Sequence, residues 1–153
     1  MNTPLQSVLV ANRGEIARRI FRTARSMGLR TVAVFADADT NAPFVADADE
    51  AVRLPDGYLD GDAVVAAALA TGSDAVHPGY GFLAENSSFA AAVEEAGLTW
   101  VGPSPSVIST MGDKLAAKEA AAAAGVPILP SSNDPTDDSP VNYPLLVKAT
   151  AGG

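Results

Sequence analysis

The sequence predicts an α/β protein built on an open, doubly wound parallel sheet. Short apolar runs alternate with helical segments as far as Val101. These runs are not interrupted by polar residues, which is typical of strands buried on both faces of a parallel sheet. The chain also opens with a strand, a helix and a second strand, a unit that forms a right-handed crossover between parallel strands. Together these observations indicate a doubly wound fold.

The opening unit is clearly marked in the sequence. A first strand is expected over Ser7–Ala11 and a second over Thr31–Phe35, with a turn at residues 12–14 between the first strand and a helix. The helix begins at Glu15, and Gly28 ends it because glycine readily adopts the left-handed conformation found just past a helix. One stripe of this helix is predicted to face the sheet, consisting of Ile16, Ile20, Phe21, Ala24 and Met27.

The middle of the chain continues the alternation. Residues 36–49 are acidic, are interrupted by Pro43 and are expected to hold one short helix. Asn86 is a candidate N-cap for a helix over residues 86–96, whose Phe89 and Val93 are predicted to face inward. The other expected elements are strands at 51–54, 75–77 and 99–101 and a helix at 62–70.

The pattern changes after Gly102-Pro103. Two successive helices are expected at 105–111 and 113–124, with no strand between them. A polar loop at 131–140 and a final strand that includes Leu145–Lys148 follow. We therefore predict a first domain over residues 1–111 and the beginning of a second domain over residues 112–153.

Composition and charge exclude several classes of function. The chain is 48% hydrophobic and 18% charged, as expected for a globular protein. Its net charge of −8 argues against binding to nucleic acid or to an anionic membrane, because the field of the whole molecule repels both. Without cysteine, neither disulfides nor thiolate metal sites can form. No apolar run approaches the roughly 20 residues of a membrane-spanning helix, and the first residues lack a signal-peptide pattern. We expect a cytoplasmic protein.

Three segments are candidates for chemistry. The first is the strand-to-helix turn at residues 10–17, where a helix N-terminus favours anions. This turn lacks the G-x-G-x-x-G pattern of dinucleotide sites, and Glu15 places a carboxylate where an anion would bind. The residues therefore argue against a dinucleotide site here.

The second candidate segment, residues 77–86, contains the only histidine of the chain, His77. Gly79 and Gly81 flank Tyr80 and allow the backbone to approach a ligand closely. Tyr80 offers a flat ring face and a hydroxyl group. The same residues are equally consistent with a tight turn that holds a packed tyrosine and a hydrogen-bonded histidine.

The third candidate is a pair of lysines on separate elements. Lys114 lies in the first turn of a predicted helix, where a cation is unfavourable against the helix dipole. Lys148 leaves the final strand just before Gly152 and Gly153, whose backbone N–H groups could face phosphates. A solvated surface lysine and a strand with a flexible tail are the alternative interpretations. Because a domain rarely ends at such a loop, we expect the N-terminal piece of a larger nucleotide-binding protein.

In this order the segments resemble the biotin carboxylase family of ATP-grasp enzymes. The resemblance rests on Val8–Ala17, on the ten residues His77–Asn86 and on shorter matches along nearly the whole chain. Those shorter matches are Gly102-Pro103, Met111–Lys114, Ala124–Pro127 and Leu146–Ala149. The chain looks most like the biotin carboxylase part of the α subunit of bacterial acetyl- or propionyl-CoA carboxylases.

The resemblance implies both an activity and a domain organisation. Such enzymes use ATP and Mg²⁺ to activate bicarbonate, and they carboxylate biotin held on a carrier protein. A Rossmann-like domain would occupy residues 1–111, and the truncated start of an ATP-grasp domain would follow over residues 112–153. The metal ligands, the residues that hold bicarbonate and the catalytic base would all lie beyond residue 153. No catalytic residue is therefore expected within the chain, which by itself should be inactive.

The resemblance also assigns binding residues. Lys114 and Lys148 would bind ATP, and Gly152-Gly153 would begin its glycine-rich lid. Tyr80 and Gly81 would line the biotin site.

Partners follow from the same resemblance. They would be a biotin carboxyl carrier domain, a carboxyltransferase subunit and a second copy in a homodimer, with Arg19 and Arg22 in the region of the dimer contact. Pyruvate and urea carboxylases share these motifs, so the final acceptor stays open. A different class of function is a stand-alone binding or assembly domain that uses the arginine-rich first helix as an interface. The run at 77–86 disfavours other ATP-grasp ligases.

Overall fold

A computed structural model describes residues 4–130, 144 and 146. The chain divides into two compact units, Met1–Ile108 and Ser109–Gly153. The predicted loop at 131–140, Lys148, Gly152 and Gly153 lie outside the described residues. The assignment of residues 112–153 to a second domain stays a prediction.

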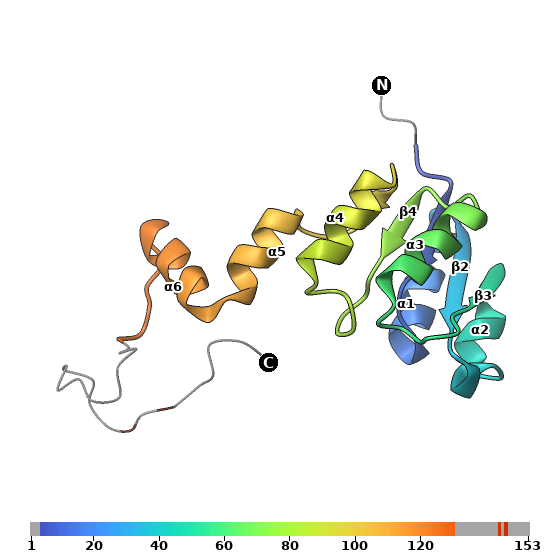
Figure 1. Ribbon diagram of the computed structural model, residues 1–153, viewed down its shortest axis with the longest axis horizontal. Coiled ribbons are helices and arrows are strands. Elements are labelled where there is room, and N and C mark those ends of the chain that lie inside the picture. The colour runs from blue at the N-terminus through green and yellow to red at the C-terminus, as the bar shows by residue number, and fades with distance from the viewer. Residues whose placement is uncertain (1–3, 131–143, 145, 147–153) are drawn as a thin grey trace. The chain divides into compact units, whose positions relative to one another are not determined.

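The first unit is an α/β fold on a five-stranded, all-parallel sheet, which confirms the predicted fold class (Figure 1). The strand order is β3-β2-β1-β4-β5. The strands are β1 (Ser7–Val10), β2 (Arg30–Phe35), β3 (Glu50–Arg53), β4 (Ala75–His77) and β5 (Thr99–Trp100). Between them lie α1 (Gly14–Ser26), the 3₁₀ helix η1 (Asp37–Asp39), α2 (Pro43–Asp47), α3 (Gly61–Ala70) and α4 (Ser87–Glu95).

The first unit has a core on each face of the sheet. Leu9 and Val32 pack in one cluster with residues of α3 and α4, whereas their neighbours Val10 and Ala33 pack in a second cluster with α1 and α2. All four residues of β1 are buried. Alternate side chains of a strand point to opposite faces, so β1 must be apolar on both faces, as the uninterrupted apolar run predicted.

Helix α1 corrects one prediction about burial. Phe21 and Ala24 are buried as expected, and Ala17 joins them. Met27 is 69% exposed, although it was predicted to face the sheet. The helix ends at Ser26, so Met27 is its C-cap and no longer continues the helical stripe. Ile16 and Ile20 are only half-buried.

Other local predictions hold with small shifts in boundary. The Asn86 side chain caps α4 by accepting a hydrogen bond from the Phe89 N–H at 2.9 Å. Phe89 and Val93 are buried, as their spacing predicted. The acidic segment at 36–49 holds η1 as well as α2, where a single short helix was expected.

Two carboxylates hold the amino ends of the central strands. Asp49 accepts hydrogen bonds from the N–H of Thr31, at 2.8 Å, and from its hydroxyl, at 2.6 Å. Asp74 accepts from the Gln6 N–H at 2.8 Å and from the Ser7 hydroxyl at 2.9 Å. These hydrogen bonds favour the ionised form, so the pKa of each carboxyl lies below its ordinary value of 3.8.

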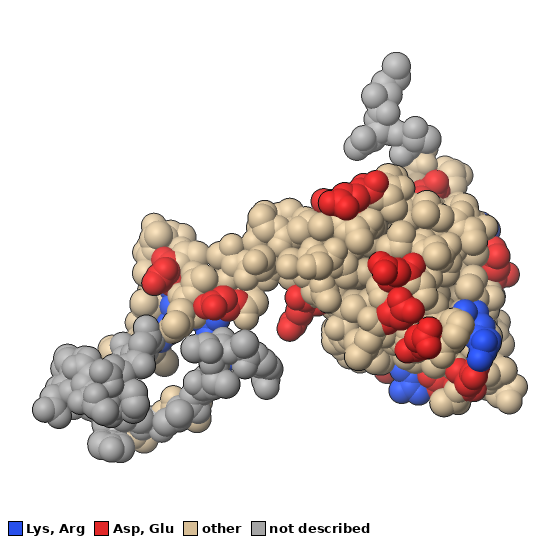
Figure 2. All heavy atoms as spheres, viewed as in Figure 1, with Lys and Arg blue, Asp and Glu red and all other residues tan. Residues whose placement is uncertain are grey.

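The acidic segment also neutralises much of the basic character of α1. Arg18 pairs with Asp47, and Arg25 lies 3.4 Å from Asp49. Arg30, at the start of β2, lies 2.9 Å from Glu50. In Figure 2 the few basic side chains on the visible face of the first unit lie beside acidic ones.

The second unit is described through its helical part. Helix α5 (Pro105–Gly112) crosses the division between the units, and α6 (Lys114–Ala123) follows without an intervening strand, as predicted. Asp113 caps α6 by accepting from the N–H groups of Leu115 and Ala116 at 2.8 and 2.9 Å. Within the described residues, no helix is both long and apolar enough to cross a membrane.

Acid unfolding tests the role of Asp74. Its pKa is lower in the folded state than in the unfolded chain, so ionised Asp74 stabilises the fold above pH 3.8. That stabilisation is lost as the pH falls through the folded-state pKa. Asp74→Asn should therefore be less stable near neutral pH and lose less stability on acidification between about pH 5 and 3. Fluorescence of the single tryptophan, the buried Trp100, reports the transition.

Asp62→Asn is the matched control. Asp62 lies on the exposed surface of α3 and forms no hydrogen bond within the described part of the chain. Its acid transition should match that of the unsubstituted protein. An Asp74→Asn curve parallel to that of the control would contradict the prediction.

Candidate functional site

Two loops meet at the carboxyl ends of the central strands β1 and β4. Residues 12–15 follow β1, and residues 78–82 follow β4. Together they line a hollow of about 350 Å³, whose walls are Asn12, Arg13, Gly14, Glu15, Ile16, Tyr80, Gly81 and Phe82. In doubly wound folds, ligands bind in the crevice outside the carboxyl ends of the strands. The structure thus brings together the first two candidate segments.

The Asn12 side chain joins the two loops. It is 2% exposed, and its Nδ2 donates to the carbonyl oxygens of Pro78 and Tyr80, each at 2.7 Å. Its Oδ1 accepts from the Arg13 N–H at 2.9 Å. Since both carbonyl groups can only accept, the amide nitrogen must face the 78–82 loop.

The backbone of this loop requires glycine at two positions. Gly79 has φ +66° and Gly81 has φ +64°, in the left-handed region. A Cβ atom on Gly79 would also lie 2.7 Å from the Asn12 Nδ2, whereas one on Gly81 would meet nothing within 4 Å. Phe82, at φ +44°, is the only non-glycine residue with positive φ within the described residues.

Tyr80 stands at the rim of the hollow, between the two glycines. Its side chain is 60% exposed, and its hydroxyl donates a hydrogen bond to the Glu15 carboxylate. That bond raises the pKa of Tyr80 above its ordinary value. Glu15 lies in the first turn of α1, so a carboxylate occupies the position that a helix N-terminus offers to an anion. This geometry favours a neutral ligand group over a phosphate beside Tyr80.

A series of contacts also links the turn after β1 to Phe82 of the 78–82 loop. Arg13 donates to the buried Asp39, with 2.7 Å between Nε and Oδ2. Tyr58 donates its hydroxyl to the same carboxylate at 2.6 Å. The ring of Tyr58 lies 5.1 Å from that of Phe82, which returns the chain of contacts to the 78–82 loop.

The charges in this chain of contacts are strongly coupled. The hydrogen bond from Arg13 lowers the pKa of Asp39, while Asp39 raises that of Arg13. Burial, followed by the hydrogen bond to Asp39, raises the pKa of Tyr58 to about 12. Asp39 is therefore ionised and Tyr58 neutral at ordinary pH, and the network is a fixed structural clamp.

His77, the last residue of β4, contacts the backbone of the 78–82 loop. Its Nδ1 accepts a hydrogen bond from the Gly79 N–H at 3.0 Å. Burial lowers the pKa of this half-buried side chain, so the neutral imidazole that the hydrogen bond requires is favoured. This contact agrees with the interpretation of His77 as a hydrogen-bonded turn residue.

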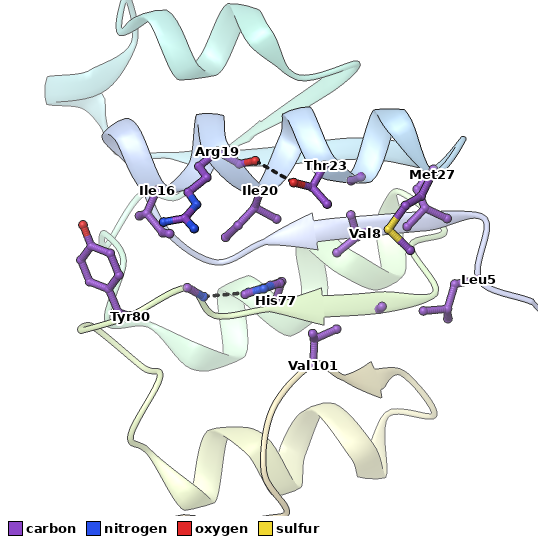
Figure 3. A pocket seen from close by; sticks show the side chains of 14 residues that line it. Leu5, Val8, Ile16, Arg19, Ile20, Thr23, Met27, His77, Tyr80 and Val101 are labelled. Atoms are coloured by element: carbon purple, nitrogen blue, oxygen red, sulfur yellow. Dashed lines mark hydrogen bonds between the residues drawn. The ribbon is translucent and has the colours of Figure 1, made fainter.

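A second open groove, which shares Ile16 and Tyr80 with the hollow, lies on the α1 side of the sheet (Figure 3). It has a volume of about 390 Å³ and apolar walls that include Val8, Ile20 and Val101. In Figure 3, Tyr80 and Arg19 stand toward one end of the groove and Met27 and Leu5 toward the other. Ile16, Ile20 and Met27 line this groove. They are the residues of α1 that were predicted to face the sheet but are half-buried or exposed.

The structure does not test the lysine pair. Lys114 is half-buried in the first turn of α6, in the second unit, as predicted. Lys148, Gly152 and Gly153 lie outside the described residues. Residues 4–130, 144 and 146 contain no cluster of three or more side chains that could hold a metal ion.

Comparison with known proteins identifies the family. Residues 4–108 match the family described as "Biotin carboxylase, N-terminal domain". The chain belongs to the biotin carboxylase family. It is 49% identical to the rice methylcrotonoyl-CoA carboxylase subunit alpha over 97% of its own length and 22% of that protein. It is 45% identical to the biotin carboxylase of Pseudomonas aeruginosa over 97% of its length and 36% of that enzyme.

A solved biotin carboxylase domain has the same architecture. It belongs to the 2-oxoglutarate carboxylase of Hydrogenobacter thermophilus, and was solved as a dimer with MgADP, ADP and bicarbonate. The TM-score is 0.91 at 43% identity, covering 99% of this chain and 36% of that one. The chain thus spans about a fifth to just over a third of the length of these three relatives.

The sequence indicated both loops of the candidate site but not the residues that hold them. Asn12 and Arg13 were interpreted only as a turn, and neither Asp39 nor Tyr58 was singled out. A polar residue directly after a fully buried central strand was the available signal for Asn12. No local pattern pairs Arg13 with a carboxylate 26 positions away.

Substitution of the two glycines tests the geometry of the loop. Gly79→Ala should destabilise the fold by more than the ~1–2 kcal/mol that a left-handed conformation costs a non-glycine residue, because its Cβ would also clash with Asn12. Gly81→Ala has open space and should show only the conformational cost. Urea unfolding followed by Trp100 fluorescence compares the two. Equal destabilisation would contradict the close packing of Gly79 against Asn12.

Proposed function

We propose that this chain forms the N-terminal part of a biotin carboxylase, which uses ATP and bicarbonate to carboxylate carrier-bound biotin. The observation that carries the proposal is the 78–82 loop, which lines an open hollow at the carboxyl ends of β1 and β4 and presents Tyr80 at its rim. Family membership across residues 4–108 supports the same activity. The proposal includes ATP, Mg²⁺ and bicarbonate, and the relative from Hydrogenobacter thermophilus binds MgADP and bicarbonate.

The two steps of the proposed reaction are assigned to different parts of the chain. Transfer of the γ-phosphoryl group of ATP to bicarbonate yields carboxyphosphate and ADP, and biotin then takes the carboxyl group while phosphate leaves. We assign the biotin side of this reaction to Tyr80 and Gly81. The exposed Tyr80 ring can pack against a flat, neutral ureido group, and Glu15 keeps phosphate away from this rim. Mg²⁺ ligands and the catalytic base are assigned to residues beyond this chain.

The ATP side is assigned to Lys114, Lys148 and the Gly152-Gly153 segment. Lys114 supports this assignment by its place in the Met111–Lys114 segment that resembles the family, where it lies half-buried in the first turn of α6. The lysines would neutralise phosphate charge through charge-assisted hydrogen bonds. The glycine pair would begin a lid whose N–H groups face the phosphates.

The proposed partners are the biotin carboxyl carrier domain, a carboxyltransferase subunit and a second copy of the enzyme, working in the cytoplasm. Four arginines between residues 13 and 30 form ion pairs, whereas Arg19 and Arg22 form none within the described part of the chain. These two arginines are thus available for a dimer contact. For the acceptor we propose an acyl-CoA, the class of substrate named for the rice relative.

A chimera tests the proposed function. This chain replaces the matched N-terminal segment of the Pseudomonas aeruginosa biotin carboxylase, to which it is 45% identical. The chimera should hydrolyse ATP in a manner that depends on both biotin and bicarbonate, whereas the 153-residue chain alone should not. A folded chimera that binds ATP but shows no biotin-dependent hydrolysis would support a stand-alone binding or assembly role instead.

Lysine substitutions in the chimera test the ATP side. Lys114→Gln and Lys148→Gln should each raise the apparent KM for ATP about 10- to 150-fold, the effect of losing one hydrogen bond to a charged group. The KM for biotin should change little. Lys118→Gln is the control on α6, because the Lys118 Nζ donates only a long 3.3 Å hydrogen bond to the Leu129 carbonyl. If Lys114→Gln behaved like Lys118→Gln, its phosphate role would be excluded.

A further inference from the structure

We propose that Asn12 is the positioning residue of the biotin-side loop, holding Tyr80 and Gly81 in place through its buried side-chain amide. The inference rests on the proposed function only in assigning this loop to biotin. The positioning itself follows from the hydrogen bonds and burial of Asn12.

The Asn12 amide continues the hydrogen bonding between β1 and β4 beyond the end of their backbone ladder. Strands β1 and β4 pair in parallel up to Val10 and His77, and the last backbone hydrogen bond runs from the Ala11 N–H to the His77 carbonyl at 2.9 Å. Beyond that point, the carbonyl groups of Pro78 and Tyr80 are both bonded by Asn12. One side chain therefore extends the pairing of β1 and β4 by two carbonyl groups, at positions where the 78–82 loop curves away from the sheet.

Serine, aspartate and alanine cannot reproduce this arrangement. An amide nitrogen carries two N–H donors, and Asn12 uses both on the loop. Its Oδ1 is fixed in turn by the Arg13 N–H, so the plane of the amide is set from both ends. Serine has one donor, aspartate has none when ionised, and alanine leaves both carbonyl groups without this partner.

The loop needs such external support because one of its residues, Phe82, has a strained backbone conformation. Three of its residues, Gly79, Gly81 and Phe82, have positive φ. For Phe82 this is strained backbone, which persists only where the surroundings impose it. The far end of the loop is held by the contact between the rings of Phe82 and Tyr58, and Tyr58 leads through Asp39 to Arg13.

Both ends of the loop are therefore fastened to consecutive residues of the β1–α1 turn. Asn12 holds the near end, and Arg13, acting through Asp39 and Tyr58, holds the far end. Tyr80 lies between the two attachments. Its own contact to Glu15 is made at the exposed rim, where a hydrogen bond contributes little to its position. Of the residues that hold the loop, Asn12 is the buried one that bonds directly to Tyr80. It therefore sets the position of Tyr80 relative to the strand ends.

The test compares Asn12→Ala and Asn12→Ser with Ser7→Ala. Ser7 is a matched control because it is equally buried, at 3% exposure, and lies at the amino end of β1, the strand that Asn12 follows. Its hydroxyl bonds to Asp74 and to the Gly72 carbonyl at the opposite end of β1. All three variants should lower thermal stability, and only the Asn12 variants should affect the loop. Asn12→Ser retains one donor and provides a milder variant if Asn12→Ala fails to fold.

The first readout is amide hydrogen exchange of residues 79–84 in the 153-residue chain, which requires no ligand. Both Asn12 variants should speed exchange of this segment by about tenfold or more, with Ser7→Ala leaving it unchanged. The second readout is steady-state kinetics in the chimera. Asn12→Ala should raise the KM for free biotin by about tenfold or more while the KM for ATP stays within about twofold, because displacement of a binding group acts on the ligand that it contacts.

The two readouts separate the inference from the proposed function. Unchanged exchange of residues 79–84 in Asn12→Ala and Asn12→Ser would overturn the positioning role, whatever the kinetics show. A uniform change in the KM of both substrates, matched by Ser7→Ala, would also overturn it in favour of a general stabilising role. Faster exchange with an unchanged biotin KM would uphold the positioning role and instead overturn the assignment of this loop to biotin.

Discussion

The structure depends on the burial of β1 on both faces. Because β1 is the central strand, its two ladders to β2 and β4 fix the register of the whole sheet. Ser7 at its amino end bonds to Asp74, and Asn12 just past its carboxyl end bonds to the loop after β4. The strand ends that shape the candidate site are thus all positioned relative to β1. A strand without solvent contact cannot shift by one residue without exchanging its two faces, so the site inherits its precision from the core.

The electrostatics of the chain are organised within the first unit. The arginine-rich start of α1 suggests a basic surface when the sequence is considered alone. In the fold, the acidic segment between β2 and β3 packs beside α1 and supplies carboxylates to Arg13, Arg18 and Arg25. The exposed pairs contribute little individually because solvent screens them. Asp39 differs because it is buried and shared by Arg13 and Tyr58, which makes it part of the framework of the site.

The sequence predicted those features that depend on neighbouring residues. The N-cap at Asn86 and the inward positions of Phe89 and Val93 follow from helical spacing, and the buried strands follow from uninterrupted apolar runs. Features that depend on contacts across the fold were not predictable in this way. Met27 is exposed because α1 ends at Ser26, one residue earlier than its apolar stripe suggests, and the contact from Asn12 to Tyr80 joins positions 68 residues apart. The loop motif was recognised because its glycines are visible in the sequence, whereas the side chains that hold it have no local pattern.

The packing of Gly79 against the Asn12 amide also limits how this site can change during evolution. Any side chain at position 79 would occupy the space of the amide, and a smaller residue at position 12 would relieve that clash but leave two carbonyl groups without their partner. Neither position can be exchanged alone without loss. We therefore expect the residues at positions 12 and 79 to change together rather than singly. A lineage that abandons this pair must rebuild the turn after β4 by other means.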